Sequence, residues 1–129
     1  HTDIARVVMQ VKRSERLHIS PILKELHWLP VYYRVTYKGI MMVFKRLNCP
    51  SPSYLSSMFR PYIPGKDLRS AKIGYLDKNG PVKVTKFGER AFSICGPVLW
   101  NNLPDDMRLI TNFTHFKSEL KTHLFRLAF

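Results

Sequence analysis

At 129 residues, with 45% hydrophobic and 12% aromatic side chains, the chain can form one folded domain, or a fragment of one, and its composition argues against wholesale disorder. Lysine and arginine number 21 against 9 aspartates and glutamates, which leaves a net charge of +12. So basic a balance favours a polyanionic partner, nucleic acid before an anionic membrane surface, and no apolar run is long enough to span a bilayer.

The first third of the chain is predicted to be helical. A short amphipathic helix is expected from Ile4 to Lys12. The step Ser20-Pro21 combines a serine N-cap with proline at the first helical position, which predicts a helix from Pro21 to about Trp28. The longest helix is expected from roughly Tyr32 to Leu47, because its large apolar side chains fall on one side.

Basic side chains form a stripe on another side of this long helix. The stripe consists of Arg34, Lys38 and Lys45. Such a stripe is either a solvated face or a contact surface for phosphates, and the sequence leaves both interpretations open.

The middle of the chain is rich in loops. Ser51-Pro52 repeats the helix-start signal and predicts a short helix to about Phe59. Residues 60–90 are then punctuated by proline and glycine and carry eight lysines and arginines against three acidic residues. This segment is expected to be a basic loop, with one short β-hairpin around Asn79-Gly80 as an alternative. The hairpin strands would be Ile73–Tyr75 and Val82–Val84.

The last third is predicted to be helical again. A helix is expected from Arg90 to Leu103, with Gly96-Pro97 starting a new helical turn. Asn112 is the expected N-cap of the final helix, and Lys117 and Lys121 flank its apolar stripe one turn apart. That stripe consists of Phe113, Phe116, Leu120, Leu124 and Leu127. The predicted fold class is therefore mainly α, a small multi-helix domain with a loop-rich basic middle segment.

The sequence offers little for catalysis, and we predict no catalytic residue, cofactor or metal site. Asp105-Asp106 follows Pro104 and suits a helix N-terminus. Cys49 and Cys95 lie far apart, and neither has the companions of a zinc site or a disulfide scaffold. A reducing compartment, nucleus or cytoplasm, is expected on that ground.

Basic groups interleaved with aromatic rings are the remaining functional signal, because cations neutralise phosphates and exposed rings stack on unpaired bases. Tyr62, Tyr75 and Phe87 are the rings expected to be exposed, although aromatic residues here also occur at core spacing. Trp28 and Trp100 each precede a Leu-Pro step and are expected to anchor helix ends in a core. The predicted phosphate contacts are Arg34, Lys38, Lys45, Arg60, Arg69, Lys72, Lys83, Lys86, Lys117 and Lys121.

Seven phrases, taken in order, resemble the C-terminal region of the reverse transcriptase polyprotein of non-LTR retrotransposons (LINE elements). The resemblance covers nearly the whole chain, and the phrases are specific through their order. They are His18-Ile19-Ser20-Pro21-Ile22-Leu23, Leu26-His27-Trp28-Leu29-Pro30-Val31, Pro52-Ser53-Tyr54-Leu55, Leu68-Arg69-Ser70, Phe87-Gly88-Glu89-Arg90-Ala91-Phe92-Ser93, Leu99-Trp100-Asn101-Asn102-Leu103-Pro104 and Phe116-Lys117 through Leu120-Lys121-Thr122-His123-Leu124-Phe125.

The resemblance implies a piece of a larger machine. In that family an endonuclease and a polymerase lie upstream, and the element copies its RNA at a nicked chromosomal site. The C-terminal region would help to hold template RNA or target DNA without catalysing the reaction itself. Its expected partners are RNA or DNA and the upstream thumb and palm. Two alternatives remain: a structural module that docks on the thumb, and a retrotransposon fragment without function.

Overall fold

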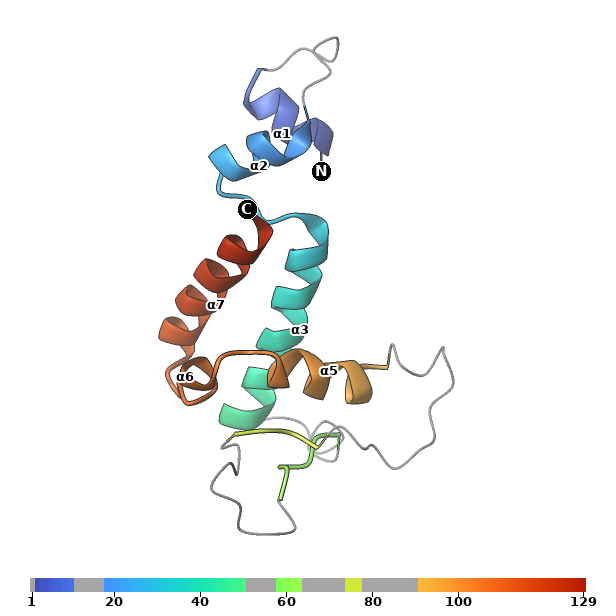
Figure 1. Ribbon diagram of the computed structural model, residues 1–129, viewed down its shortest axis with the longest axis vertical. Coiled ribbons are helices and arrows are strands. Elements are labelled where there is room, and N and C mark those ends of the chain that lie inside the picture. Colours follow the sequence, from blue (N-terminus) through green and yellow to red (C-terminus); the bar gives the residue numbers. More distant parts are fainter. Residues whose placement is uncertain (1, 11–17, 51–57, 64–73, 78–90) are drawn as a thin grey trace.

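The computed structural model describes residues 2–10, 18–50, 58–63, 74–77 and 91–129, and these residues are mainly helical, as the sequence predicts (Figure 1). The only β-type pairing within them is an antiparallel bridge between Pro61 and Leu76. The helices are α1 (Thr2–Val8), α2 (Ile19–Glu25), α3 (Val31–Asn48), α5 (Phe92–Asn101), α6 (Asp105–Arg108) and α7 (Phe113–Ala128).

Helices α3 and α7 lie side by side and run in opposite directions (Figure 1). At one end the Tyr33 hydroxyl donates to the carbonyl of Leu127 at 2.8 Å. Towards the other end the rings of Phe44 and Phe116 stack with centroids 4.1 Å apart. Helix α5 crosses α3 at this second end, while α1 and α2 lie beyond the first end, close to the C-terminus (Figure 1).

Two apolar clusters hold the helices together. The main core is built around Phe44, Phe116 and Trp100, all of them almost fully buried, and it joins α3, α5 and α7. The second cluster joins α1 and α2 through Ala5, Ile22 and Leu23. Trp28 and Phe129 pack against the second cluster from the α2–α3 link and the C-terminus. Phe129, the residue that follows α7, thus connects the second cluster to the main core.

The N-terminus of α2 corrects the predicted cap. The helix begins at Ile19, and the N-cap is His18, whose Nδ1 accepts a hydrogen bond from the Ser20 N–H at 3.3 Å. Pro21 therefore lies in the first helical turn rather than at its first position. This is tolerated because the backbone N–H groups of the first turn have no partner inside the helix, so proline forfeits nothing there.

The C-terminus of α2 comes earlier than predicted, and it ends in a Schellman turn. The N–H of His27 donates to the Lys24 carbonyl at 3.1 Å, and the N–H of Trp28 donates to the Leu23 carbonyl at 2.8 Å. His27 takes the left-handed position of this motif, with φ of 52°, where glycine is most common. Trp28 is therefore outside the helix, held by its own backbone hydrogen bond.

Helix α5 runs through Gly96-Pro97, so the prediction of a new helical turn at that step was wrong. Proline has no N–H and removes one hydrogen bond from the helix interior. Both Gly96 and Pro97 are buried, and Gly96 lies against Phe59 and Val43 of the main core, so packing offsets that loss. Helix α1 also differs from its prediction, because it spans Thr2–Val8 and is followed by Gln10 in the left-handed region.

The final helix begins as predicted, and its apolar stripe is buried only in the middle. The side chain of Asn112 accepts from the N–H of His115 at 3.0 Å, which confirms the N-cap. Phe116, Leu120 and Leu124 are buried. Phe113 and Leu127, the two ends of the predicted stripe, are 39% and 57% exposed.

The described part of the middle segment pairs in a way that the sequence did not predict. Residues 60–62 and 75–77 form the antiparallel bridge, with the Tyr62 N–H on the Tyr75 carbonyl and the Asp77 N–H on the Arg60 carbonyl, both at 2.9 Å. The predicted helix from Ser51 and the predicted strand Val82–Val84 lie outside the described residues. The alternative of a hairpin around Asn79-Gly80 therefore stays a prediction.

Gly96→Ala is expected to lower the free energy of unfolding, whereas Gly39→Ala is expected to leave it unchanged or raise it slightly. A Cβ at Gly96 would lie 2.8 Å from Cε1 of Phe59, a buried core ring. Overpacking of this kind costs about 1–3 kcal/mol, which exceeds the roughly 1 kcal/mol that alanine gains over glycine in a helix. At Gly39 the nearest atom is a terminal methyl of Leu99 at 3.0 Å, and this half-buried side chain can shift.

Urea unfolding of both variants checks this expectation. Gly96→Ala should be less stable than the wild type, and Gly39→Ala equally stable or slightly more stable. If Gly96→Ala were as stable as Gly39→Ala, the packing around Gly96 would be looser than the contact distances indicate.

Candidate nucleic-acid interface

A cavity of about 590 Å³ lies where α3, α7, α1 and the α2–α3 link meet. We call it the cationic cavity, because basic residues from two helices and aromatic residues from the link line it together. The lining residues are Ile4, His27, Trp28, Leu29, Arg34, Tyr37, Lys38, Lys117 and Lys121.

Four of the predicted phosphate contacts line this cavity. Arg34 and Lys38 stand one turn apart on α3, and Lys117 and Lys121 stand one turn apart on α7. All four side chains are exposed. The antiparallel packing of the two helices brings the pairs to one site although they are far apart in the sequence.

The charged side chains that the structure places around the cationic cavity are all basic. Among the described residues no carboxylate lines it, and α3 contains no aspartate or glutamate along its whole length. Like charges one turn apart on a helix repel each other and destabilise it by about 0.2–0.5 kcal/mol per pair. The isolated protein therefore has two self-repelling pairs at one site, and an anionic ligand would relieve both.

Apolar and aromatic side chains line the cavity beside these cations. Leu29 is buried, whereas Trp28 and Tyr37 are half-buried and contribute ring surface. Burial raises the pKa of the Tyr37 phenol above its usual value of 10, so this group stays neutral at physiological pH. Trp28 was predicted as a core anchor, and the structure gives it a second contact surface at the cavity.

The other described cations of the prediction lie elsewhere. Lys45 shares a helix with Arg34 and Lys38, but it lies near the opposite end, with its Nζ 5.4 Å from the ring centroid of Phe113. It stands three helical turns from Arg34 and does not line the cavity. Arg60 is exposed beside the antiparallel bridge. Arg69, Lys72, Lys83 and Lys86 lie outside the described residues.

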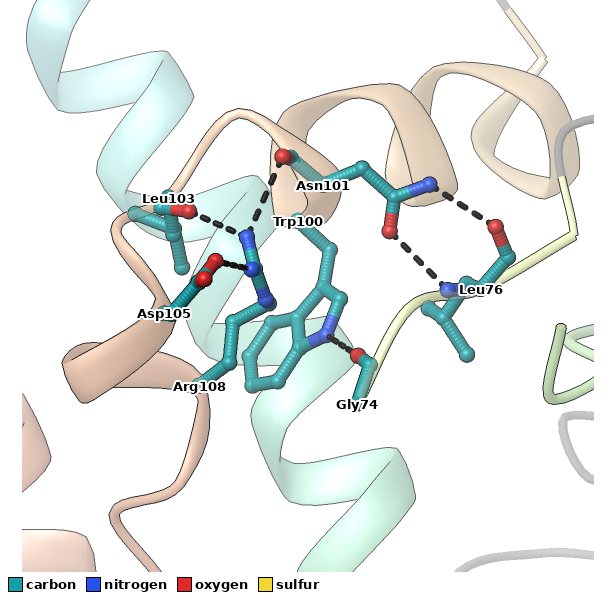
Figure 2. A network of polar contacts seen from close by, with 7 residues as sticks. All are labelled: Gly74, Leu76, Trp100, Asn101, Leu103, Asp105 and Arg108. Carbon is teal, nitrogen blue, oxygen red and sulfur yellow. Dashed lines mark hydrogen bonds and ion pairs between the residues drawn. The ribbon is translucent and has the colours of Figure 1, made fainter. Parts of the chain in front are cut away.

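The basic middle segment is anchored at residues 74–77 by the end of α5 (Figure 2). The Asn101 side chain makes two hydrogen bonds to Leu76, its Oδ1 accepting from the N–H at 2.9 Å and its Nδ2 donating to the carbonyl at 2.8 Å. The Trp100 indole N–H donates to the Gly74 carbonyl at 2.9 Å. Trp100 is therefore a core anchor, as predicted, and it also fixes the chain between two basic stretches.

Arg108 is a buried cation that the sequence did not single out. Its guanidinium donates to the carbonyls of Asn101 and Leu103 at the end of α5 and pairs with the Asp105 carboxylate (Figure 2). It also lies 4.0 Å over the ring of Tyr75. Tyr75 was predicted as an exposed stacking ring, but it is half-buried and covered by Arg108. This arginine stabilises the contact between the end of α5 and residues 74–77, and it is not available to phosphates.

Asp105 and Asp106 lie in the first turn of α6, as the sequence predicts for this pair. Among the described residues no three histidine, cysteine, aspartate or glutamate side chains gather into a metal-binding group. In the same residues no helix is both long and apolar enough to cross a membrane.

No protein-family model, curated protein or solved structure matches this chain. The resemblance to retrotransposon polyproteins therefore stays a prediction. The sequence missed the cavity residues that are not basic, above all His27, Trp28 and Tyr37. The one available signal was the aromatic phrase His27-Trp28 placed just before a helix that carries a basic stripe.

Proposed function

We propose that this chain binds nucleic acid without catalysing a reaction, through the cationic cavity. The observation that carries the proposal is the convergence of Arg34, Lys38, Lys117 and Lys121 on one cavity that no carboxylate of the described residues lines. The phosphates of RNA and DNA are the common anions that such a cluster of cations suits, and their neutralisation supplies most of the sequence-independent affinity for nucleic acid. The net charge of +12 adds long-range attraction.

We propose further that the parent protein is the reverse transcriptase polyprotein of a non-LTR retrotransposon. The support is the ordered series of seven phrases, which includes Leu26-His27-Trp28-Leu29-Pro30 and Leu99-Trp100-Asn101-Asn102-Leu103-Pro104. In that setting the chain would hold template RNA or target DNA beside the upstream polymerase, in the nucleus or the cytoplasm.

A structural docking role is the second candidate, and one observation favours it. Val31, Tyr32 and Val35 are 58%, 71% and 66% exposed at the start of α3. Side chains of this kind gain from burial against a partner surface. Under this alternative the partner would be the upstream thumb, and neutralising the cavity cations would leave nucleic-acid binding unchanged.

Neutralising two cavity cations tests the proposed function. The double variant Lys38→Gln/Lys121→Gln is expected to bind RNA and DNA oligonucleotides at least about tenfold more weakly than the wild type at low salt. Its slope of log affinity against log salt should be shallower by about 1.4–1.8, since each lost phosphate contact removes about 0.7–0.9. Fluorescence anisotropy titrations at several salt concentrations measure both quantities.

The control removes the same charge outside the cavity. Lys24 and Arg126 are exposed and do not line it, so Lys24→Gln/Arg126→Gln should change affinity far less. A folded wild type that binds no nucleic acid at about 50 mM salt would rule the proposal out. Equal losses in the two double variants would show that only net charge matters.

A further inference from the structure

We infer that the cationic cavity receives an unpaired base of a single-stranded nucleic acid, stacked against Trp28, while the four cations hold the adjoining phosphates. The cavity can serve in this way only if the chain binds nucleic acid at all, so the site rests on the proposed function. The ligand is thereby specified further: it is a single strand with an accessible base rather than nucleic acid in general.

Two recognition chemistries meet in this one cavity. Arg34 and Lys38 on one side and Lys117 and Lys121 on the other supply positive charge. Trp28, Tyr37 and His27 supply aromatic rings within the same lining. Phosphates alone need no ring surface, and a hydrophobic ligand alone needs no cations. A polyanion that also presents flat aromatic faces satisfies both halves of the site.

Single strands and duplexes differ in this respect. A duplex presents its phosphates outward but keeps the faces of its bases stacked inside, so it can meet the cations and not the rings. A single strand exposes both, and proteins that bind it commonly combine a positively charged surface with aromatic stacking platforms. The volume of about 590 Å³ falls within the range of about 300–1,000 Å³ that is usual for sites of small organic groups.

The backbone positions Trp28 before any ligand arrives. Its N–H is bound to the Leu23 carbonyl in the Schellman turn, and its side chain packs against the second apolar cluster. The preceding His27 holds a left-handed conformation, and its ring lies 5.4 Å from that of Phe125 on α7. The link that presents the indole is thus fixed to both α2 and α7, so little ordering is needed on binding.

Intrinsic fluorescence reports stacking at this tryptophan. The chain has two tryptophans, and Trp100 is only 1% exposed, so a stacking ligand should quench Trp28 selectively. Oligouridylate and oligothymidylate are expected to quench the wild type, whereas the Trp28→Phe variant, which keeps only Trp100, should show no quenching. A duplex of the same length should leave the wild type's fluorescence unchanged.

Affinity gives the second readout. Trp28→Leu removes the stacking surface and keeps apolar packing, so it should weaken single-strand binding about tenfold and leave duplex binding unchanged. The matched control is Tyr32→Leu, because Tyr32 is an exposed ring on α3 that does not line the cavity. Thermal unfolding shows whether each variant is folded. If Trp28→Leu is unfolded, the comparison of quenching between the wild type and Trp28→Phe still tests the site.

The outcomes separate the two proposals. Tight single-strand binding with quenching at Trp28 supports the site. Equal affinity for single strand and duplex, with no effect of Trp28→Leu on either, overturns the stacking site and leaves the proposed function standing. Binding to neither, or tighter binding to an acidic polyglutamate peptide than to any oligonucleotide, overturns both.

Discussion

Asn101→Leu is expected to lower the free energy of unfolding by about 2–5 kcal/mol. The substitution keeps the approximate shape of the side chain but removes both of its hydrogen bonds to Leu76, which is 3% exposed. A buried backbone group left without a partner costs about 1–3 kcal/mol, and here an N–H and a carbonyl are stranded together. Urea unfolding followed by circular dichroism measures the loss.

Hydrogen exchange locates the same effect. The amide of Leu76 should exchange much faster in Asn101→Leu than in the wild type, because its acceptor is gone. Asn102→Leu is the matched control, since Asn102 is the exposed neighbour and its variant should lie within about 0.5 kcal/mol of the wild type. Similar losses in both variants would mean that the end of α5, rather than its contact with Leu76, had been damaged.

Phe44→Ala is expected to cost about 3–5 kcal/mol, which is the usual range for deleting a fully buried aromatic ring. Phe44 has no exposed surface, stacks on Phe116, and lies near Trp100 with centroids 6.4 Å apart. It joins the two helices that carry the cationic cavity. The variant should therefore also bind nucleic acid more weakly, even at temperatures where it remains folded.

Denaturation and anisotropy titrations measure these two effects separately. Met42→Ala is the control on the same helix, because Met42 is 52% exposed and its truncation should change neither quantity much. Unchanged affinity in folded Phe44→Ala would show that the cavity does not depend on how α3 and α7 pack.

Local chemistry explains why most helices could be predicted. Asn112 caps α7 with its own side chain, and the apolar period from Phe116 to Leu124 marks the buried face. Such signals act over one or two turns, so a sequence shows them directly. Predictions failed where two local signals competed. At Ser20-Pro21, His18 took the cap, and at Gly96-Pro97 burial outweighed the lost hydrogen bond.

The burial of two polar residues could not be predicted from the sequence, for a different reason. Asn101 and Arg108 are polar side chains of a kind that usually faces solvent, and they are buried because partners from a distant segment satisfy them. Leu76 lies 25 positions before Asn101 along the chain, and no local pattern announces such a pairing. Tyr75 was for the same reason predicted as exposed.

By itself the sequence determined the helical fold class, the excess of positive charge, and the helix faces that carry Arg34, Lys38, Lys117 and Lys121. Only the tertiary structure decided which of these cations meet. The antiparallel packing of α3 and α7 joins the two pairs, places Trp28 beside them and leaves Lys45 outside. The physical reason is range: caps and periodicity act within a few residues, whereas a binding site is made by contacts between segments that the chain itself keeps far apart.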